Sequence, residues 1–584
     1  MSAWWPDSAE DAVWTPEMVT FARRATDAGL PFAPRVALGT ARGIPPDAVR
    51  RGRVALGAGG TLYIAPTARS VESVAQWTSR HPEIAARVAV AAPSELRRAM
   101  IAADAKEFAA RAVDELDRHA PGLSARQVLW PRQIAVITFI FVACTLALIF
   151  DPIYAAAVIG FTATTFFLAV SIFRFTAASL LRQQGLPKAA PVPHTPDNEL
   201  PVYTVLVPLF REAAVVRHVV AALRRLDWPS DRLDVKMILE EDDLETRAAV
   251  ERHLPGPPFE AIVVPGIGPR TKPKALAFAH LFSRGEFVVI YDAEDDPDPR
   301  QLREAHARFA AEPELACVQA PLLIDNPDQS WIAKLFAIEY SALFDGLLPM
   351  LASMGLPMPL GGTSNHFRRS VLDEVGGWDP FNMTEDADLG LRLARCGHRV
   401  GTITLPTYEE APIRFGAWMR QRTRWFKGWM QTCLVHTRQP LQLAADLGFK
   451  STIGFVTIQL GMILSAMLHP IFLVALAVIA MQRGFVEASP PSWLVIFGVA
   501  NLAAGYAAMI ALASRTLALR GLSRIEPALV ALPVYWLLMS VATYRALWDL
   551  VVRPHYWAKT THFGVLASPK ARSSNLDRAA EQRA

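Results

Sequence analysis

The sequence predicts an α/β fold in which an open parallel sheet lies between transmembrane helices and follows a small α+β domain. Three observations support this fold class. Strand and helix patterns alternate through the middle of the chain, long apolar runs flank that region, and 52% of all residues are hydrophobic. A chain of 584 residues is also too long for one hydrophobic core, so we expect several domains.

The charge and the cysteine content argue against several classes of protein. The formal net charge is only +4 and the basic residues are dispersed, so we expect no nucleic-acid partner. The four cysteines are far apart and form no C-x-x-C pair, which is typical of reduced thiols. They are Cys144, Cys317, Cys396 and Cys433. We therefore expect neither a disulfide framework nor a zinc site.

Residues 1–120 predict a separate soluble domain. The residues from Met1 to Asp11 lack the basic and apolar order of a signal peptide, so we expect the N-terminus to stay in the cytoplasm. A β-hairpin around Gly57–Gly60 and two helices follow. Their ranges are Val54–Leu56, Leu62–Ile64, Ser70–Arg80 and Ser94–Asp114.

Residues 130–175 predict a transmembrane hairpin. Two uncharged apolar runs, Gln133–Phe150 and Ile153–Phe173, are each long enough to cross a bilayer, and only Asp151-Pro152 separates them. Basic residues flank both outer ends, which places these ends inside the cell. They are Arg126, Arg132, Arg174, Arg182 and Lys188. We therefore expect residues 190–440 to be cytosolic.

The cytosolic segment alternates short β-rich runs with helical runs, which predicts a parallel sheet covered on both faces. The expected strands are Val202–Leu209, Val235–Leu239, Ala261–Val264 and Phe287–Tyr291. The expected helices include Glu212–Leu226 and Lys274–Phe282. Ligands bind such sheets at the carboxyl ends of the strands. Two acidic clusters, Glu240–Asp243 and Asp292–Asp296, follow two of these ends.

Residues 450–550 predict further membrane helices. The apolar blocks are Ser451–Met481, Trp493–Ala513 and Ile525–Leu547. The first is long enough to hide a break at His469-Pro470. The arginines before the last block and the tail at 551–584 both look cytosolic, and one span cannot place both on the same side. Either Pro533 marks a hairpin or one flank breaks the positive-inside rule, and we expect an even total near six.

Asp292 and Glu294 are the candidate metal ligands. They follow a Phe-Val-Val-Ile run, and alternate carboxylates at the end of a strand can share a hard cation that is bound to a diphosphate. A solvated acidic turn is the alternative.

Glu240-Glu241-Asp242-Asp243 is the second acidic cluster. Four adjacent carboxylates repel one another, so a cation or a hydrogen-bond donor is expected nearby. Lys272 and Lys274 could also bring positive charge to phosphates. An exposed turn and an ordinary helix start are the alternatives.

Thr384-Glu385-Asp386 begins a helical run, Leu389–Cys396, that Gly397 closes. The threonine is a plausible N-cap, with acidic residues in the first turn. A carboxylate at this helix end can also act as a general base, and position alone does not separate the two interpretations.

Gln421-x-x-Arg424-Trp425 lies in a stretch, 413–440, that is dense in Trp, Arg and Met. One interpretation is an interfacial amphipathic helix, whose aromatic and basic side chains lie among lipid headgroups. The other places Trp425 against a sugar ring and Arg424 near a pyrophosphate. Both can hold at once.

In this order and with membrane runs on both sides, the motifs resemble those of the processive membrane type of family 2 inverting glycosyltransferases, similar to bacterial cellulose synthase and hyaluronan synthase. The resemblance covers residues 190–440 and the membrane runs beside them. It implies a nucleotide-sugar-binding sheet of the GT-A type, a UDP-sugar donor, a polysaccharide acceptor, and Mg²⁺ or Mn²⁺ as the cofactor.

On the donor side, the resemblance implies that Glu241 contacts the uridine and that Lys272 lies near the diphosphate. Asp292 and Glu294 correspond to the metal-binding D-x-D. Gln421-x-x-Arg424 corresponds to the Q-x-x-R part of the motif that binds the nucleotide sugar. Glu241 and Glu294 stand where the family usually has aspartate, so each arm is one methylene longer.

On the acceptor side, Gly362 and Thr363 correspond to a loop that lines the acceptor end. Asp386, beside Glu385, corresponds to the general base. Trp425 corresponds to the tryptophan under the acceptor sugar.

The two ends of the chain carry looser resemblances. In the tail, Trp557, Lys559 and Thr560 loosely resemble a loop that closes over bound nucleotide. Only residues 551–584 follow the last apolar block, without the cyclic di-GMP-binding barrel of cellulose synthases. Residues 1–120 resemble the N-terminal domain of type II secretion and pilus ATPases, some of which bind cyclic di-GMP. The implied partner is cyclic di-GMP or a secretion-complex protein, and a passive docking module is the alternative.

The resemblance implies inverting, processive transfer of a sugar, with glucose from UDP-glucose as the leading donor, to a growing β-glycan exopolysaccharide. Transfer would be coupled to export across a bacterial inner membrane, with the catalytic domain in the cytosol. A non-processive enzyme acting on a lipid phosphate is one alternative. An inactive scaffold or sensor of a secretion complex is the other.

Overall fold

A computed structural model describes residues 15–36, 38, 53–56, 60–66, 71–186, 195–482 and 492–556. The chain forms two compact units, which are described separately below. Unit one comprises Met1–Glu115, His194–Ala293 and Phe367–Asp373. Unit two comprises Leu116–Pro193, Glu294–His366 and Glu374–Ala584.

Unit one begins with a small α+β domain around a four-stranded sheet of order β1-β4-β3-β2. The strands are β1 (Phe32–Ala33), β2 (Arg53–Leu56), β3 (Leu62–Ile64) and β4 (Val88–Ala91). The helices are α1 (Pro16–Asp27), α3 (Val71–Arg80), α4 (Pro82–Ala85) and α5 (Pro93–His119). The antiparallel pairing of β2 with β3 confirms the predicted hairpin. Phe21, Ala25, Val71 and Val90 form the buried core.

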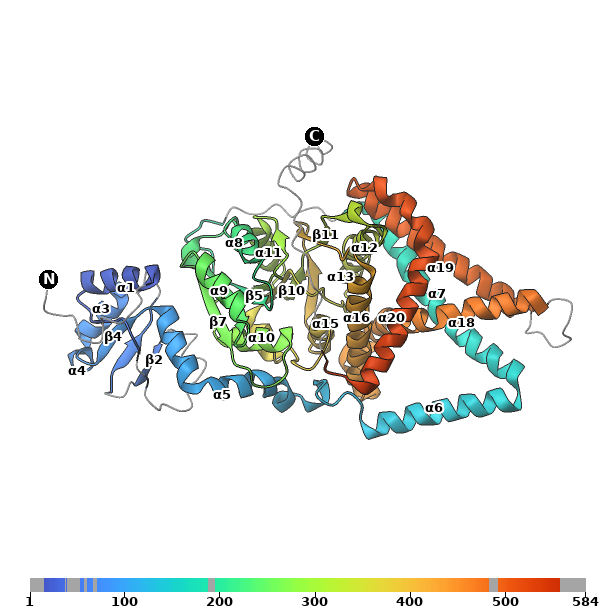
Figure 1. The fold of residues 1–584 in the computed structure, drawn as a ribbon, viewed down its shortest axis with the longest axis horizontal. Coiled ribbons are helices and arrows are strands. Elements are labelled where there is room, and N and C mark those ends of the chain that lie inside the picture. Colours follow the sequence, from blue (N-terminus) through green and yellow to red (C-terminus); the bar gives the residue numbers. More distant parts are fainter. Residues whose placement is uncertain are drawn as a thin grey trace. The chain divides into compact units, whose positions relative to one another are not determined.

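The large sheet of unit one has the order β12-β8-β5-β6-β7. Its strands are β5 (Tyr203–Leu209), β6 (Leu233–Glu240), β7 (Phe259–Val264), β8 (Phe287–Ile290) and β12 (Asn365–Arg368), the last belonging partly to each unit. β5 pairs in parallel with β6 and β8, and β6 with β7. All eight residues of β6 are buried, which fits a sheet covered on both faces. Figure 1 shows helices α8 (Val216–Leu223), α9 (Leu244–His253) and α10 (Lys272–His280) beside these strands.

A buried ionic cluster attaches α5 to this sheet within unit one. Arg97 of α5 donates to Glu260 on β7 at 2.7 Å, and Lys236 on β6 contacts the same carboxylate at 2.6 Å. Lys236 also contacts Asp234 at 2.9 Å. All four side chains are buried, so each charge depends on the others for compensation.

Unit two contains the remaining strands and the apolar helices. β10 (Leu315–Gln319) pairs in parallel with β13 (Arg399–Thr402), and β12 follows β10 in the sheet order. A second sheet has the order β11-β14-β9. Its strands are β11 (Leu322–Ile324), β14 (Thr407–Glu409) and β9 (Asp296–Pro297). Unit two also contains α11 (Gln301–Ala311) and α15 (Glu385–Arg395), whereas α14 (Arg369–Glu374) lies almost entirely in unit one.

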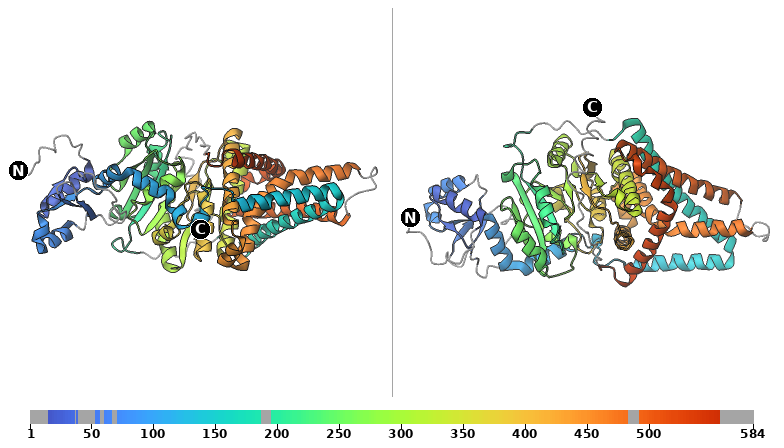
Figure 2. Two further views of the ribbon diagram at one scale, coloured as in Figure 1. Left: turned by 90° about the horizontal axis from the view of Figure 1, so that it is seen from below. Right: turned by 45° about the horizontal axis from the view of Figure 1, so that its top comes forward.

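Six helical segments of the described chain are long and apolar enough to cross a membrane. The predicted hairpin is confirmed as α6 (Pro131–Phe150) and α7 (Pro152–Gln184), with the Asp151 side chain capping α7. α19 (Ser492–Leu519) packs along α7, and the two lie side by side in Figures 1 and 2. Gly505 permits this contact, because a Cβ there would meet the ring of Phe167 at 2.4 Å.

One of the six segments, Trp331–Ser353, was not predicted. In its most apolar stretch of 18 residues, 72% is buried inside the protein. It consists of α12 (Trp331–Tyr340), a π-helical turn (Ser341–Leu347) and α13 (Leu348–Ser353). Burial by protein explains its apolar composition without contact to lipid.

The C-terminal helices differ from the prediction at two prolines. α17 (Pro440–Phe455) leads through a π-helical turn into α18 (Gly461–Gln482), which continues through Pro470, so the break considered at that proline is absent. Pro533 lies in the first turn of α20 (Leu532–Val552) and marks no hairpin. A 3₁₀ segment, Ser523–Ala531, precedes α20.

Candidate active site

Three of the predicted donor-site residues lie at one edge of the unit-one sheet. Glu241 follows β6, Asp292 lies two residues beyond the end of β8, and Lys272 is the first residue of α10. Because the strands are parallel, their carboxyl ends meet at the same edge.

Lys272 and Asp292 form an ion pair. Thr271 fixes the start of α10, since its side chain accepts a hydrogen bond from the backbone of Lys274, and Pro273 suits the first turn. Both members of the pair stay partly exposed. A cation and a carboxylate with solvent access at this edge can meet a phosphate and the metal bound to it.

Cations compensate the second acidic cluster, as its composition predicted. Lys274 contacts Glu240 at 3.3 Å and Arg270 contacts Asp242 at 2.5 Å. Burial raises the pKa of Glu240, and Lys274 only partly opposes this effect. Glu241 is exposed and accepts a hydrogen bond from the backbone of Gly266 at 2.9 Å, so it borders open space where a ligand can reach it.

Asp292 and Glu294 are partly exposed, whereas Ala293 and Asp295 are buried. The two D-x-D carboxylates are therefore accessible to solvent, whereas the residue between them and the residue after them are not. Among the described residues, no group of three or more His, Cys, Asp and Glu side chains is placed to hold a metal. Two carboxylates still suit Mg²⁺ or Mn²⁺, because such ions complete their coordination with substrate phosphates and water.

In unit two, hydrogen bonds hold the loop around Gly362 and Thr363. The side chain of Thr363 donates to Asp295, and its carbonyl accepts from Gln319 at 3.0 Å. Ser364 has a positive φ of 56°, which the close packing around it maintains. The loop is therefore fixed beside the residue that follows Glu294.

The first turn of α15 carries Glu385 and Asp386, of which Glu385 is buried and Asp386 is partly exposed. Thr384 occupies the N-cap position, but its side chain makes no capping hydrogen bond, which corrects that part of the prediction. It faces Gly428 of the next helix, where a Cβ would lie 2.5 Å from its hydroxyl oxygen. Of the two acids, Asp386 is the one that an acceptor hydroxyl can reach.

The helix α16 (Phe415–His436) carries Gln421, Arg424 and Trp425. More than half of its residues are buried, including Gln421, while Arg424 and Trp425 are partly exposed. The helix is thus packed within unit two, and exposes less of its surface than an amphipathic helix lying on lipid would.

Aromatic side chains of α12 surround Trp425. Its ring stacks on Tyr340 at 6.2 Å between centroids and approaches Phe336 at 6.0 Å. Tyr340 and Phe336 of α12 therefore form part of the surroundings of the candidate sugar platform.

Arg422 connects α16 to α12 and α20. It occupies one of the unspecified positions of the Q-x-x-R-W motif. It is buried, contacts Glu339 of α12 at 2.7 Å, and lies 4.5 Å from the centre of the Trp425 ring. Tyr535 of α20 donates to the same Glu339 at 2.7 Å. Glu339 and Tyr340 were missed, and the signal that could have found them is a charged residue inside an apolar run.

The start of the tail binds to α16. Lys427 donates to the carbonyl oxygen of Tyr556 at 2.7 Å, and Gln431 donates to that of Pro554 at 3.1 Å. Burial lowers the pKa of Lys427 to about 8. Trp557, Lys559 and Thr560, the predicted gating residues, lie outside the described residues.

The candidate residues thus form two groups, one in each unit. Glu241, Lys272 and Asp292 lie in unit one. The remaining described candidates lie in unit two; they are Glu294, Gly362, Thr363, Glu385, Asp386, Gln421, Arg424 and Trp425. Asp292 and Glu294 are two residues apart in the chain, at the point where one unit gives way to the other.

Residues 287–548, which include the D-x-D, T-E-D and Q-x-x-R-W motifs, match the family described as glycosyl transferase family group 2. This part of the chain is therefore similar to glycosyltransferases of that family. All of the unit-two candidates lie within the matched range, and so does Asp292.

Several curated proteins are also similar to part of this chain. The probable glycosyltransferase YdaM of Bacillus subtilis is 26% identical over 40% of this chain and 56% of its own length. Glucomannan 4-beta-mannosyltransferase 2 of Arabidopsis thaliana is 27% identical over 40% of this chain and 45% of its own length. This chain therefore spans about half the length of the curated relatives it matches.

Among solved structures, the mannosyltransferase PcManGT from Pyrobaculum calidifontis, in complex with GDP-Man and Mn²⁺, is 20% identical and aligns with a TM-score of 0.44. The match covers 67% of this chain and 99% of that protein. A TM-score this low supports no conclusion about the site.

Proposed function

We propose that this protein transfers a sugar, with inversion, from a nucleotide diphosphate sugar to a growing glycan. The observation that carries the proposal is the pairing of Lys272 with Asp292 at the carboxyl edge of a parallel sheet, beside the exposed Glu241. The relatives are named glycosyltransferases and mannosyltransferases, which supports the same reaction class.

On the donor side, Lys272 binds the diphosphate by charge, and Glu241 contacts the base. Asp292 and Glu294 would hold Mg²⁺ or Mn²⁺, which neutralises the leaving diphosphate when bound. We assign Gln421 and Arg424 to the pyrophosphate.

On the acceptor side, Asp386 takes the proton from the acceptor hydroxyl as that oxygen attacks the sugar carbon from the face opposite the leaving group. Trp425 supports the acceptor sugar ring by stacking, because a flat apolar surface matches the C–H face of a sugar. Gly362 and Thr363 line the end of the acceptor. One direct displacement inverts the configuration at the sugar carbon.

We further propose that the enzyme is processive and exports its product, a β-glycan exopolysaccharide, across a bacterial inner membrane. The apolar helices on both sides of the glycosyltransferase domain support an enzyme mounted in a membrane, with the domain in the cytosol. Glucose from UDP-glucose is the leading donor. The relatives named mannosyltransferases make mannose the sugar to test beside it.

The N-terminal α+β domain is proposed to bind a regulator, either cyclic di-GMP or a protein of a secretion complex. Its attachment to the large sheet through Arg97 and Glu260 supports transmission from this domain to β7. Titration of the full-length protein with cyclic di-GMP tests the first of these partners, and absence of binding at millimolar concentration excludes it.

Replacing the base tests the proposal. We expect Asp386→Asn to abolish polymer formation, because an amide cannot take the acceptor proton, while UDP still binds with wild-type affinity. Incorporation of radiolabelled sugar and calorimetric titration with UDP measure the two effects. Asp231→Asn, which changes an exposed carboxylate elsewhere, serves as the control. Wild-type synthesis by Asp386→Asn would refute the role of Asp386.

A further inference from the structure

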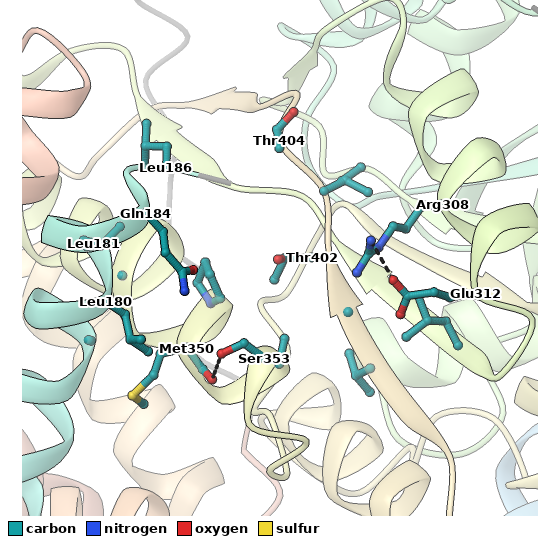
Figure 3. A pocket seen from close by; sticks show the side chains of 18 of the residues that line it. Leu180, Leu181, Gln184, Leu186, Arg308, Glu312, Met350, Ser353, Thr402 and Thr404 are labelled. Atoms are coloured by element: carbon teal, nitrogen blue, oxygen red, sulfur yellow. Dashed lines mark hydrogen bonds and ion pairs between the residues drawn. The ribbon is translucent and has the colours of Figure 1, made fainter. Parts of the chain in front are cut away.

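Unit two contains a cavity of about 410 Å³ that none of the candidate catalytic residues lines. Its lining residues come from the last turns of α7, from the short helix α13, and from α11, β13 and the residues that follow these two elements (Figure 3). This volume falls in the range of sites that bind small molecules, roughly 300–1,000 Å³.

The two walls of the cavity differ in chemistry. Leu180 and Leu181 of α7 and Met350 of α13 form an apolar wall, as Figure 3 shows. Arg308 and Glu312, at the end of α11, belong to the opposite wall, which carries the charged side chains and is called the polar wall below. A ligand that fills the cavity must therefore be amphiphilic.

The length of α7 places the cavity relative to a bilayer. The helix has 33 residues, which at about 1.5 Å per residue corresponds to roughly 50 Å. A bilayer has a hydrocarbon core of about 30 Å and measures about 40–45 Å with its headgroups. Leu180 lies about 40 Å from the start of α7. If α7 crosses a membrane from Pro152, the cavity opens at the depth of the headgroups.

The charged side chains that line the polar wall have no net charge, since two are cationic and two are anionic. Arg308 pairs with Glu312 at 2.7 Å. Arg399 lies 3.9 Å from the same carboxylate and pairs at 2.7 Å with Glu314, which does not line the cavity. Glu304 is the fourth charge, and the backbone of Thr404 donates to it at 2.9 Å. Two cations and two anions favour a ligand that itself carries both signs, and they give no net attraction to an anion.

We propose that this cavity binds a phospholipid with a zwitterionic phosphoethanolamine headgroup. Its phosphate would contact Arg308 and Arg399, its ammonium group would donate to Glu312, and the start of its acyl chains would lie against Leu180 and Leu181. None of the described residues that line the cavity is aromatic, so it offers no cage for the quaternary ammonium of choline.

The inference is independent of the donor sugar and of the polymer, and it can be tested by binding alone. Full-length protein is purified in detergent, stripped of lipid, and titrated by native mass spectrometry with phosphatidylethanolamine, phosphatidylcholine and phosphatidylglycerol of identical acyl chains. We expect phosphatidylethanolamine to bind about tenfold more tightly than the other two, since it alone satisfies both signs of charge with hydrogen bonds. Free phosphoethanolamine should bind far more weakly, because it leaves the apolar wall uncovered.

Three variants make the test specific. Arg308→Gln should weaken phosphatidylethanolamine binding about tenfold. Glu312→Gln leaves the wall net positive and should shift the preference to phosphatidylglycerol. Arg303→Gln, on α11 but outside the cavity, should bind lipid as the wild type does.

Ser353→Phe provides a second route if Arg308→Gln does not fold. Ser353 is exposed and lines the cavity from α13, so a phenyl ring there occupies the space without removing a charge. We expect it to abolish the headgroup preference. Equal binding of the three lipids by the wild type, or an unchanged preference in both Ser353→Phe and Glu312→Gln, would overturn the proposal.

Discussion

At the scale of single residues, the ion pair between Lys272 and Asp292 is the contact on which the proposed donor site depends most. The two side chains are twenty positions apart, and they meet because a parallel sheet brings its carboxyl ends to one edge. A lysine beside a carboxylate that can bind a metal is placed to hold a phosphate as well.

Replacing Lys272 should weaken donor binding. Lys272→Met removes a charge-assisted contact of about 1.5–3 kcal/mol, so we expect the Kd for UDP with Mn²⁺ to rise by about 10- to 100-fold. Isothermal titration calorimetry measures it. Arg270→Met, which removes an exposed ion pair two residues away, should stay within about twofold of the wild type. An unchanged Kd for Lys272→Met would exclude the diphosphate contact.

The sequence predicts residues that follow strands better than residues that meet across helices. Asp292 and Glu241 could be found because acidic residues that follow a buried parallel strand lie at the carboxyl edge of the sheet. The charge of Glu339 inside an apolar run could have marked this segment, but not its partners, since the contacts of Glu339 and Tyr340 with Arg422 and Trp425 join segments that are more than eighty positions apart. No local pattern encodes such a pairing.

At the scale of elements, the close approach of α15 to α16 positions the candidate base. Gly428 makes it possible, because a Cβ at this position would lie 2.6 Å from the backbone nitrogen of Thr384. The T-E-D turn is therefore held directly against the helix that carries Trp425.

A methyl group at position 428 should disturb this contact. We expect Gly428→Ala to destabilise the protein by about 1–3 kcal/mol through overpacking and to lower sugar transfer. Gly416→Ala, on the same helix, meets its nearest atom, the Arg420 guanidinium, only at 3.7 Å, and should be neutral or stabilising. Thermal unfolding in detergent compares the two variants. Equal melting temperatures would show that the contact is looser than described.

One element that sequence patterns missed is the helical segment Trp331–Ser353. Lys334, Glu339 and Asp345 interrupt its apolar character, and protein rather than lipid covers most of its surface. An apolar helix that is buried in protein has the same composition as one that crosses a membrane, so only tertiary contacts separate the two cases.

At the scale of the whole molecule, the contacts of α20 bear on a conflict in the predicted topology. The segments before and after this helix both look cytosolic, and a single crossing cannot place both on the same side. Before it, Arg524 contacts Asp328 at 2.9 Å, and after it Lys427 binds the carbonyl of Tyr556. Between these ends, Tyr535 accepts a hydrogen bond from Trp418 of α16 at 3.3 Å. α20 thus runs beside α16, as Figure 1 shows, and both of its flanks contact parts of unit two that carry strands or the candidate site.

We expect α20 to lie along the membrane interface, so that four helices cross: α6, α7, α18 and α19. Single cysteines at Ser523, Tyr556 and Asp151, in a cysteine-free background, test this with a membrane-impermeant maleimide. Positions 523 and 556 should react on the same side and position 151 on the other. Labelling of 523 and 556 from opposite sides would show that α20 crosses.

Topology was the least predictable property of the chain. The two uncharged runs around Asp151-Pro152 predicted the helical hairpin of α6 and α7, because they leave one arrangement. At residues 525–547 the apolar composition does not decide the topology, because an apolar helix packed along α16 needs no crossing. The even number of crossings that we expected can therefore be met without a hairpin at Pro533.

The measurement that tests the central claim most directly is size analysis of the product made by purified full-length protein in vesicles with radiolabelled UDP-glucose and, in parallel, GDP-mannose. We predict a high-molecular-weight β-glycan from one donor, lost on addition of EDTA and absent with Asp386→Asn. A single sugar that extracts with lipid would contradict processive synthesis, and absence of metal-dependent turnover with either donor would contradict the assigned reaction.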